Sequence, residues 1–196
     1  TYDTDIPVPT WRQPNGGIQP ATGATEQTVD TCGMLYALSE CDKVIADRGG
    51  QSMKYRAELL RQHAQGFGEE LASSLIYANT GSTPLKFMGL APRFASQSGE
   101  QASNILTSAA TPDGSDNTSI WIVGSSPRTI HLITPKGLPT GMKHTPYGEV
   151  MIENIDGSGG RMPGYRDMLE QHIGLVVRDW RYIVRIQYDL EDVVAS

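Results

Sequence analysis

One long amphipathic helix is the strongest structural signal in this sequence. From Met53 to Asn79 the chain reads MKYRAELLRQHAQGFGEELASSLIYAN, and apolar residues recur at steps of three and four, which is the spacing of one helical face. At about 1.5 Å per residue this helix is about 40 Å long, so we expect both halves of the chain to pack against it. The apolar stripe consists of Met53, Ala57, Leu60, Ala64, Phe67, Leu71, Leu75 and Ala78. The opposite, solvent-facing side is expected to carry Arg56, Arg61, Gln62, Gln65, Glu69 and Ser73.

Both ends of this helix carry recognisable signals. Ser52 is placed to cap the first turn, Gly81 is suited to a left-handed exit, and Pro84 cannot continue a helix. Gly66 and Gly68 flank Phe67 in mid-helix. They are either tolerated weak points or mark a bend or the close approach of another backbone.

The composition indicates an ordered, loop-rich chain. It has 196 residues, of which 38% are hydrophobic, with 21 Gly, 12 Pro and a net charge of −6, which suits one large domain or two small ones. The sequence contains no apolar run of about 20 residues for a membrane span, and its first residues do not resemble a signal peptide. No dense Lys/Arg patch marks a nucleic-acid footprint. Cys32 and Cys41 fit no zinc spacing, so we expect reduced thiols.

The first 38 residues indicate an extended arm. Pro7, Pro9, Pro14 and Pro20 oppose a helix, and a polar, Thr-rich stretch follows them. A segment this poor in core residues is either disordered or ordered by packing on something outside itself, such as a strand of another subunit. Its scattered anchors are Trp11, Ile18, Val29, Met34 and Leu35.

Short elements are expected on both sides of the long helix. Residues 39–48 predict a short helix capped by Ser39, with Val44 and Ile45 facing inward. Residues 85–94 form an apolar connector, and residues 95–118 are rich in Ser, Thr, Asn, Gly and Asp, which is typical of a surface excursion.

The C-terminal half is β-like. The clearest strand is Trp180–Tyr188, where Trp180, Tyr182, Val184 and Ile186 share one face and the other face is mostly polar. The remaining strand candidates are residues 119–123, 129–134, 147–155, 165–173 and 175–177.

Catalytic and metal-binding patterns were sought and none stands out. The four histidines lack the spacing of a zinc helix, and Asp113, Asp116 and Asn117 lack the calcium-loop pattern and indicate a solvated turn. A hydrolase using His131 or His172 with a nearby carboxylate is the alternative from a different functional class. We therefore predict no catalytic residues, no cofactor and no metal. Arg178, Arg181 and Arg185 lie on a strand edge or face, where they either meet solvent and local ion pairs or pair with acidic groups of another subunit.

Two motifs and the order of elements carry a family resemblance. FMGLAPRF at Phe87–Phe94 follows the long helix, and GLVVRDWRYIVRI at Gly174–Ile186 closes the β region. With the polar arm and the long helix, they resemble the major capsid proteins of tailed bacteriophages with the Hong Kong-97-type fold, in the epsilon-fifteen-like subgroup. The resemblance spans nearly the whole chain.

This resemblance implies an α+β capsid fold. Residues 1–12 would be the N-terminal arm, 13–38 the extended loop over a neighbouring subunit, 39–83 the short and spine helices, and 84–196 a β-rich peripheral domain with part of an axial domain. Capsid proteins of this subgroup continue past the last strand, so part of the axial domain is expected to lie beyond Ser196.

The same resemblance implies a structural function. The chain would assemble into pentamers and hexamers of an icosahedral virion shell in the host bacterial cytoplasm. The shell would enclose double-stranded DNA without reading its sequence, and decoration, cement and portal proteins would be further partners. A non-viral nanocompartment of the same fold is the alternative.

The interface residues follow from these expectations. No lysine precedes Lys43, which excludes an isopeptide cross-link from the arm and loop, so we expect a shell without covalent cross-links. The candidate subunit-interface residues are Trp11, Ile18, Val29, Arg178, Arg181 and Arg185.

Overall fold

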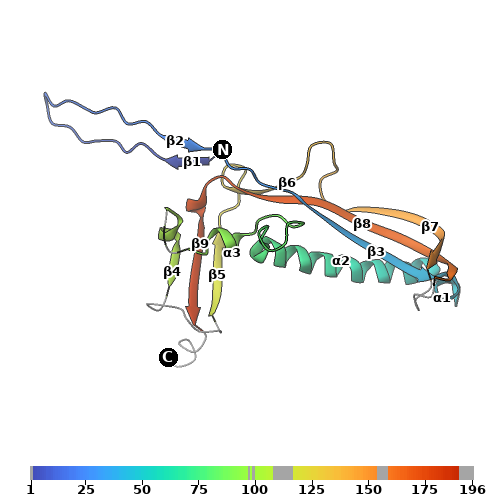
Figure 1. Ribbon diagram of the computed structural model, residues 1–196. Coiled ribbons are helices and arrows are strands. Elements are labelled where there is room, and N and C mark those ends of the chain that lie inside the picture. The colour runs from blue at the N-terminus through green and yellow to red at the C-terminus, as the bar shows by residue number, and fades with distance from the viewer. Residues whose placement is uncertain (1, 97, 99, 108–116, 154–158, 190–196) are drawn as a thin grey trace. The chain divides into compact units, whose positions relative to one another are not determined.

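The computed structural model describes residues 2–96, 98, 100–107, 117–153 and 159–189 (Figure 1). The chain forms two compact units, each built from separate stretches of sequence. Unit 1 comprises Thr1–Asp30, Arg93–Leu132 and Leu175–Ser196, and unit 2 comprises Thr31–Pro92 and Ile133–Gly174.

Unit 2 contains an antiparallel sheet centred on the long strand β8 (Arg161–Val177). On one side β3 (Gly33–Asp42) pairs with β8 from Gly33↔Ile173 to Asp42↔Gly164. β7 (Lys143–Glu153) also pairs with β8, with a register shift between Pro146 and Gly148. β6 (Ile130–Ile133), of which only Ile133 belongs to unit 2, completes the order β3-β8-β6. The two predicted strands at 165–173 and 175–177 are thus one strand, and the predicted loop 13–38 includes the start of β3.

The predicted long helix is confirmed as α2 (Ser52–Tyr77), which runs along one face of β3, β8 and β7 (Figure 1). Its predicted ends are wrong in detail. Ser52 is already helical, and the N-cap is Gln51 without a side-chain cap bond. Gly49 and Gly50 take positive φ values of 85° and 71°, so the backbone itself makes the turn into the helix.

The helix exit also differs from the prediction. Gly81 is not among the residues with positive φ. Instead Ala78 is extended and its N–H donates to the Ser74 carbonyl, while the Asn79 Oδ1 accepts from the Gly81 N–H at 2.8 Å. The Asn79 side chain therefore organises the turn that was assigned to a left-handed glycine.

The apolar connector packs directly on the last turn of α2. The Gly89 N–H donates to the Ala78 carbonyl at 2.8 Å, and a Cβ at Gly89 would lie 2.9 Å from the carbonyl oxygens of Ser74 and Ile76. Glycine is therefore required within the FMGLAPRF motif because two backbones meet there. The buried apolar residues of unit 2 are Ala46, Phe67, Ala78, Phe87, Leu90, Ile152, Leu169 and Ile173.

The short helix before α2 corrects a second expectation. β3 continues to Asp42, which leaves α1 only Lys43–Asp47. The cap is Asp42, whose carboxylate accepts from the Val44 N–H at 2.7 Å, and Ser39 is a buried strand residue. Val44 and Ile45 are exposed and Ala46 faces inward at 1% exposure, because the later start shifts the helical phase.

Unit 1 contains a hairpin and a small sheet. β1 (Tyr2–Asp5) and β2 (Ala24–Glu26) pair antiparallel at the base of a long loop. In the sheet, β9 (Ile183–Asp189) lies between β4 (Ile105–Thr107, parallel) and β5 (Asn117–Val123, antiparallel). Unit 1 also contains the short helices η1 (Glu100–Asn104) and η2 (Trp180–Tyr182). The helix α3 (Leu90–Arg93) belongs to unit 2 except for Arg93.

The predicted facing of the last strand is inverted. Residues 180–182 form η2, and Ile183, on the face expected to be polar, is fully buried. Arg185 shares this inner face. Its Nη1 donates to the Phe94 carbonyl at 2.7 Å and its guanidinium lies 5.2 Å from the centre of the Trp121 ring. An arginine with these partners packs where periodicity alone expects an apolar residue.

The predicted surface excursion at 95–118 is partly structured. Ile105 is buried in β4, and the Asn104 side-chain amide donates to the Trp180 and Ile183 carbonyls at 3.0 and 2.8 Å. Asp113 and Asp116 of the predicted solvated turn lie outside the described residues.

Candidate assembly interface

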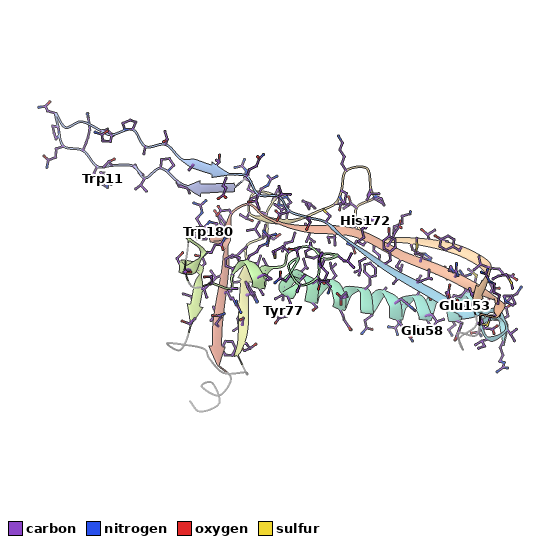
Figure 2. The ribbon with its side chains drawn as sticks, in the orientation of Figure 1. Trp11, Glu58, Tyr77, Glu153, His172 and Trp180 are labelled. Atoms are coloured by element: carbon purple, nitrogen blue, oxygen red, sulfur yellow. The ribbon has the colours of Figure 1, made fainter. Side chains whose placement is uncertain are left out.

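The hairpin of unit 1 exposes apolar side chains that contact little else of the chain. Every residue from Ile6 to Val29 is exposed, and we call this segment the arm. Trp11 is 102% exposed and Val29 89%, and Figure 2 shows Trp11 on the arm. Local order in the arm comes from the pairing of β2 with β1 and from a turn in which the Gly16 N–H donates to the Gln13 carbonyl at 3.0 Å. Within the described part of the chain, these large apolar side chains of the arm therefore stay accessible to solvent. The exposed apolar residues of the arm are Ile6, Val8, Trp11, Ile18 and Val29.

Unit 2 presents a second apolar surface on the side of its sheet that faces away from α2. In β3, burial alternates along the strand: Leu35 and Ala37 are half-buried and Ser39 is buried, whereas the residues between them are exposed and point to the other side. Met34, Tyr36 and Leu38 are 69%, 51% and 50% exposed. We call this surface the outer sheet face. It consists of Met34, Tyr36 and Leu38 of β3, Met168 and His172 of β8, and Tyr147 of β7.

Contacts across the strands organise the outer sheet face. The Tyr36 and His172 rings pack edge to face at 5.7 Å between centroids, and the Tyr36 hydroxyl lies 3.3 Å from His172 Nε2. The Tyr147 hydroxyl donates to the Met168 sulfur at 3.8 Å. These contacts fix the positions of large side chains on this face while leaving Tyr36 and Tyr147 about half exposed.

The inner side of the same sheet carries a buried charge cluster. The Asp167 side chain is 7% exposed and accepts from Arg56 Nη2 at 2.9 Å with both oxygens. The Arg56 guanidinium also lies 4.7 Å from the Tyr165 ring centre, and His144 Nε2 lies 3.1 Å from Asp167. The prediction that Arg56 faces solvent is therefore wrong. The cluster joins α2 to β7 and β8 by satisfied polar contacts, which is a structural arrangement.

The structure places the three predicted arginines differently. Arg178 is exposed and its Nη1 donates to the Pro127 carbonyl at 3.3 Å. Arg181 donates to the Asp179 carboxylate through Nε and Nη2, both at 2.7 Å, and these bonds lower the pKa of Asp179. Arg185 packs inside unit 1. A role of these arginines between subunits stays a prediction, as does that of Trp11, Ile18 and Val29, which are exposed on the arm.

The histidines of the hydrolase alternative do not assemble a reactive site. His172 contacts Tyr36, and His131 Nδ1 is buried without a hydrogen-bond partner. Within the described ranges, neither ring hydrogen-bonds a carboxylate, and no cluster of three His, Cys, Asp or Glu side chains suits a metal. Burial raises the pKa of the Cys41 thiol, so it is protonated and weakly nucleophilic at neutral pH. No helix in the described part of the chain is long and apolar enough to cross a bilayer.

The described residues thus show a long helix packed on a sheet, an exposed arm that carries apolar side chains, and an accessible sheet face. The chain belongs to the family of the major capsid protein GP7, whose family model matches residues 1–193. This membership confirms the capsid-protein resemblance.

A solved phage structure supports the same assignment. The chain is similar to a chain in the structure of bacteriophage epsilon15, with 37% sequence identity and a TM-score of 0.65 over 94% of this chain. It spans 55% of that chain's length. A search of curated proteins found no match. The predicted α+β fold of the Hong Kong-97 type is confirmed by this similarity.

Proposed function

We propose that this chain is a shell subunit that self-assembles into the icosahedral head of a tailed bacteriophage around double-stranded DNA. The observation that carries this proposal is the arm, in which every residue from Ile6 to Val29 is exposed and five large apolar side chains face solvent. Membership in a capsid-protein family gives this arm a natural partner, namely a second copy of the chain. Pentamers and hexamers are the oligomers that such a shell requires.

In the assembled shell, the arm of one subunit lies over a neighbouring subunit. The outer sheet face supplies a suitable surface because Met34, Tyr36 and Leu38 are apolar or aromatic and accessible. Extended, proline-containing segments such as Ile6–Pro14 dock well on aromatic surfaces. Burying the arm in this way couples its ordering to assembly.

The charge of the chain suits a container for DNA. The net charge is −6, and the sequence has no dense Lys/Arg patch to bind a phosphate backbone. The shell therefore encloses the nucleic acid without sequence-specific binding. Assembly takes place in the host bacterial cytoplasm, and the product is part of the virion. Portal and decoration proteins are further partners of such a head.

Electron microscopy of the purified protein tests this proposal. We expect closed shells for the parent chain and single chains or small oligomers for Trp11→Asp, which places a charge in the arm's apolar surface. Gln13→Asp is the matched control, because it adds the same charge to the same arm without removing apolar area. Absence of shells under any condition of purification from infected or expressing cells would refute the proposal. DNA in the particles distinguishes a phage head from a nanocompartment filled with enzyme cargo.

A further inference from the structure

The root of the arm is held by a buried ion pair. Asp30 is the first covered residue after the exposed arm, and Arg93 Nη2 donates to its Oδ1 at 2.6 Å. The side chains are only 16% and 11% exposed for Arg93 and Asp30, respectively. A charge-assisted bond of this length with little water around it is strong and weakly screened by salt.

The same arginine also reaches a second chain segment. Arg93 Nη2 lies 3.3 Å from the Leu175 carbonyl. Asp30, Arg93 and Leu175 are each the residue of unit 1 at which the chain passes to or from unit 2. One guanidinium thus connects three of the four places where the chain leaves or enters unit 1.

The backbone at Arg93 is anchored in the core of unit 1. The next residue, Phe94, is 1% exposed, its carbonyl accepts from Arg185 at 2.7 Å, and its ring packs edge to face on Trp121 at 6.0 Å. A fixed backbone lets the Arg93 side chain transmit that rigidity to Asp30.

Side-chain packing at the arm root is incomplete. Thr28 borders a cavity of about 180 Å³ that is also lined by Arg93, Phe94, Gln101, Val177 and Trp180, so the last arm residues stand beside open space. A polar contact, the Asp30–Arg93 ion pair, is therefore needed to hold the arm root where the side chains leave a gap.

We propose that Arg93 is a conformational clasp that fixes the direction in which the arm leaves unit 1. With the ion pair closed, the arm root moves together with the core around Phe94. With it open, the arm swings about residues 28–30. This inference does not rest on the proposed function, because every contact in it lies within unit 1.

Electron–electron distance measurements between two spin labels test the clasp. The labels are placed at Gly17→Cys on the arm and Ile122→Cys on β5, with Cys32 and Cys41 replaced by serine. All labelled proteins also carry Trp11→Asp, which is expected to weaken contacts of the arm with a second chain. Only the single-chain fraction is measured, and an excess of unlabelled protein suppresses distances between labels on different chains. Arm contacts with a second copy therefore cannot mask the result, whether or not the parent forms shells.

We expect Asp30→Asn and Arg93→Gln each to widen the distance distribution by roughly twofold, because a buried charge loses its partner. Arg181→Gln breaks an Arg–Asp pair confined to η2 and is the matched control, with no expected widening. The exchanged pair, Asp30→Arg with Arg93→Asp, should narrow the distribution again.

The clasp is overturned if Asp30→Asn and Arg93→Gln leave the distribution as narrow as in the parent, or if Arg181→Gln widens it equally. Circular dichroism checks folding of each variant. If Arg93→Gln does not fold, Arg93→Lys decides the question. Lysine keeps the positive charge but cannot donate to Asp30 and to the Leu175 carbonyl in the same planar geometry. A distance distribution of intermediate width for Arg93→Lys therefore supports the clasp, and a distribution as narrow as that of the parent contradicts it.

Discussion

Arg56 and Arg185 lie on inner faces of α2 and β9, where residue polarity alone predicts solvent. Each has partners that replace water: Asp167 and the Tyr165 ring for Arg56, and the Phe94 carbonyl and Trp121 ring for Arg185. Their long aliphatic stems pack like apolar side chains. These partners are distant in sequence, so no local pattern could have predicted the burial.

Removing Asp167 should be costly, because it leaves Arg56 partly buried without its counter-charge. We expect Asp167→Ala to lower the free energy of unfolding by about 3 kcal/mol, measured by chemical denaturation. Glu58→Ala is the control, since it breaks the exposed Glu58–Arg61 pair on the same helix and should leave the midpoint nearly unchanged. Equal denaturation midpoints for Asp167→Ala and Glu58→Ala would show that the buried cluster contributes nothing to the stability of the fold.

Phe67 is the central buried side chain of α2, with 6% exposure, as its place on the apolar stripe predicts. Phe67→Ala should therefore destabilise the chain by about 3–5 kcal/mol, the range for emptying a large aromatic from a core. Met53→Ala, at a stripe position that the structure leaves 82% exposed, should cost little. A Phe67→Ala variant that melts within a degree or two of the parent would contradict this packing.

Asp179 gives a pH-dependent prediction. Hydrogen bonds from the Arg181 side chain lower the pKa of Asp179, so its contribution to stability is fully present above the unfolded-state pKa of about 3.9. That contribution is lost as the pH falls through the lower folded-state pKa. We expect parent and Asp179→Asn to differ in unfolding free energy at pH 5 to 7 and to converge below about pH 4. If the difference in unfolding free energy between the two proteins grew on acidification, the pKa of Asp179 would be raised by folding and not lowered, which would refute the prediction.

Among the elements, α2 was predictable and β3 was not. The apolar periodicity of α2 is local, so its existence follows from the sequence, whereas its ends depend on Gly49, Gly50 and Asn79. β3 was assigned in part to the extended loop. Tyr36 meets His172 across a separation of 136 residues, so this strand is specified by its distant partner β8.

The arm and the strands after α2 show the same contrast between features that follow from local sequence and features that depend on distant residues. Prolines and the lack of core residues predicted an extended, partly exposed arm over residues 1–38, of which residues 6–29 are exposed and residues 33–38 belong to β3. The face of β9 was predicted wrongly because Arg185 obtains its partners, the Phe94 carbonyl and the Trp121 ring, from other parts of the sequence. The outer sheet face could have been found from the alternation of Met34, Tyr36 and Leu38, had that stretch been recognised as a strand.

The two glycines in the middle of α2 are weak points of the helix. A Cβ at Gly66 or Gly68 would meet nothing within 4 Å, so within the chain no backbone approach requires them. Each of Gly66→Ala and Gly68→Ala should raise the unfolding free energy of single chains by about 0.5–1 kcal/mol. Gly89→Ala is the opposite control, because its Cβ would press on two carbonyl oxygens. Destabilisation by Gly66→Ala would show that the open space is filled in solution.

At the scale of the molecule, each unit is assembled from separate stretches of the chain. The division into 1–12, 13–38, 39–83 and 84–196 remains a proposal, and residues 84–196 contribute to both units. Contiguous ranges are what sequence reasoning yields most readily, whereas the pairing of β3 with β8 is a long-range property. Neither unit buries the arm, which is why the proposed function assigns the arm's contacts to a second copy.

Hydrogen–deuterium exchange of the arm amides tests the central claim most directly, namely that the arm is ordered by a neighbouring subunit. Assembled particles and single chains are compared, with the amides of β8 as an internal reference because β8 is paired within the chain in both states. We predict that amides between Ile6 and Gly23, which precede the strand β2, exchange slowly in particles and rapidly in single chains, while those of β8 stay protected in both. Equal protection of the arm in the two states would contradict the account.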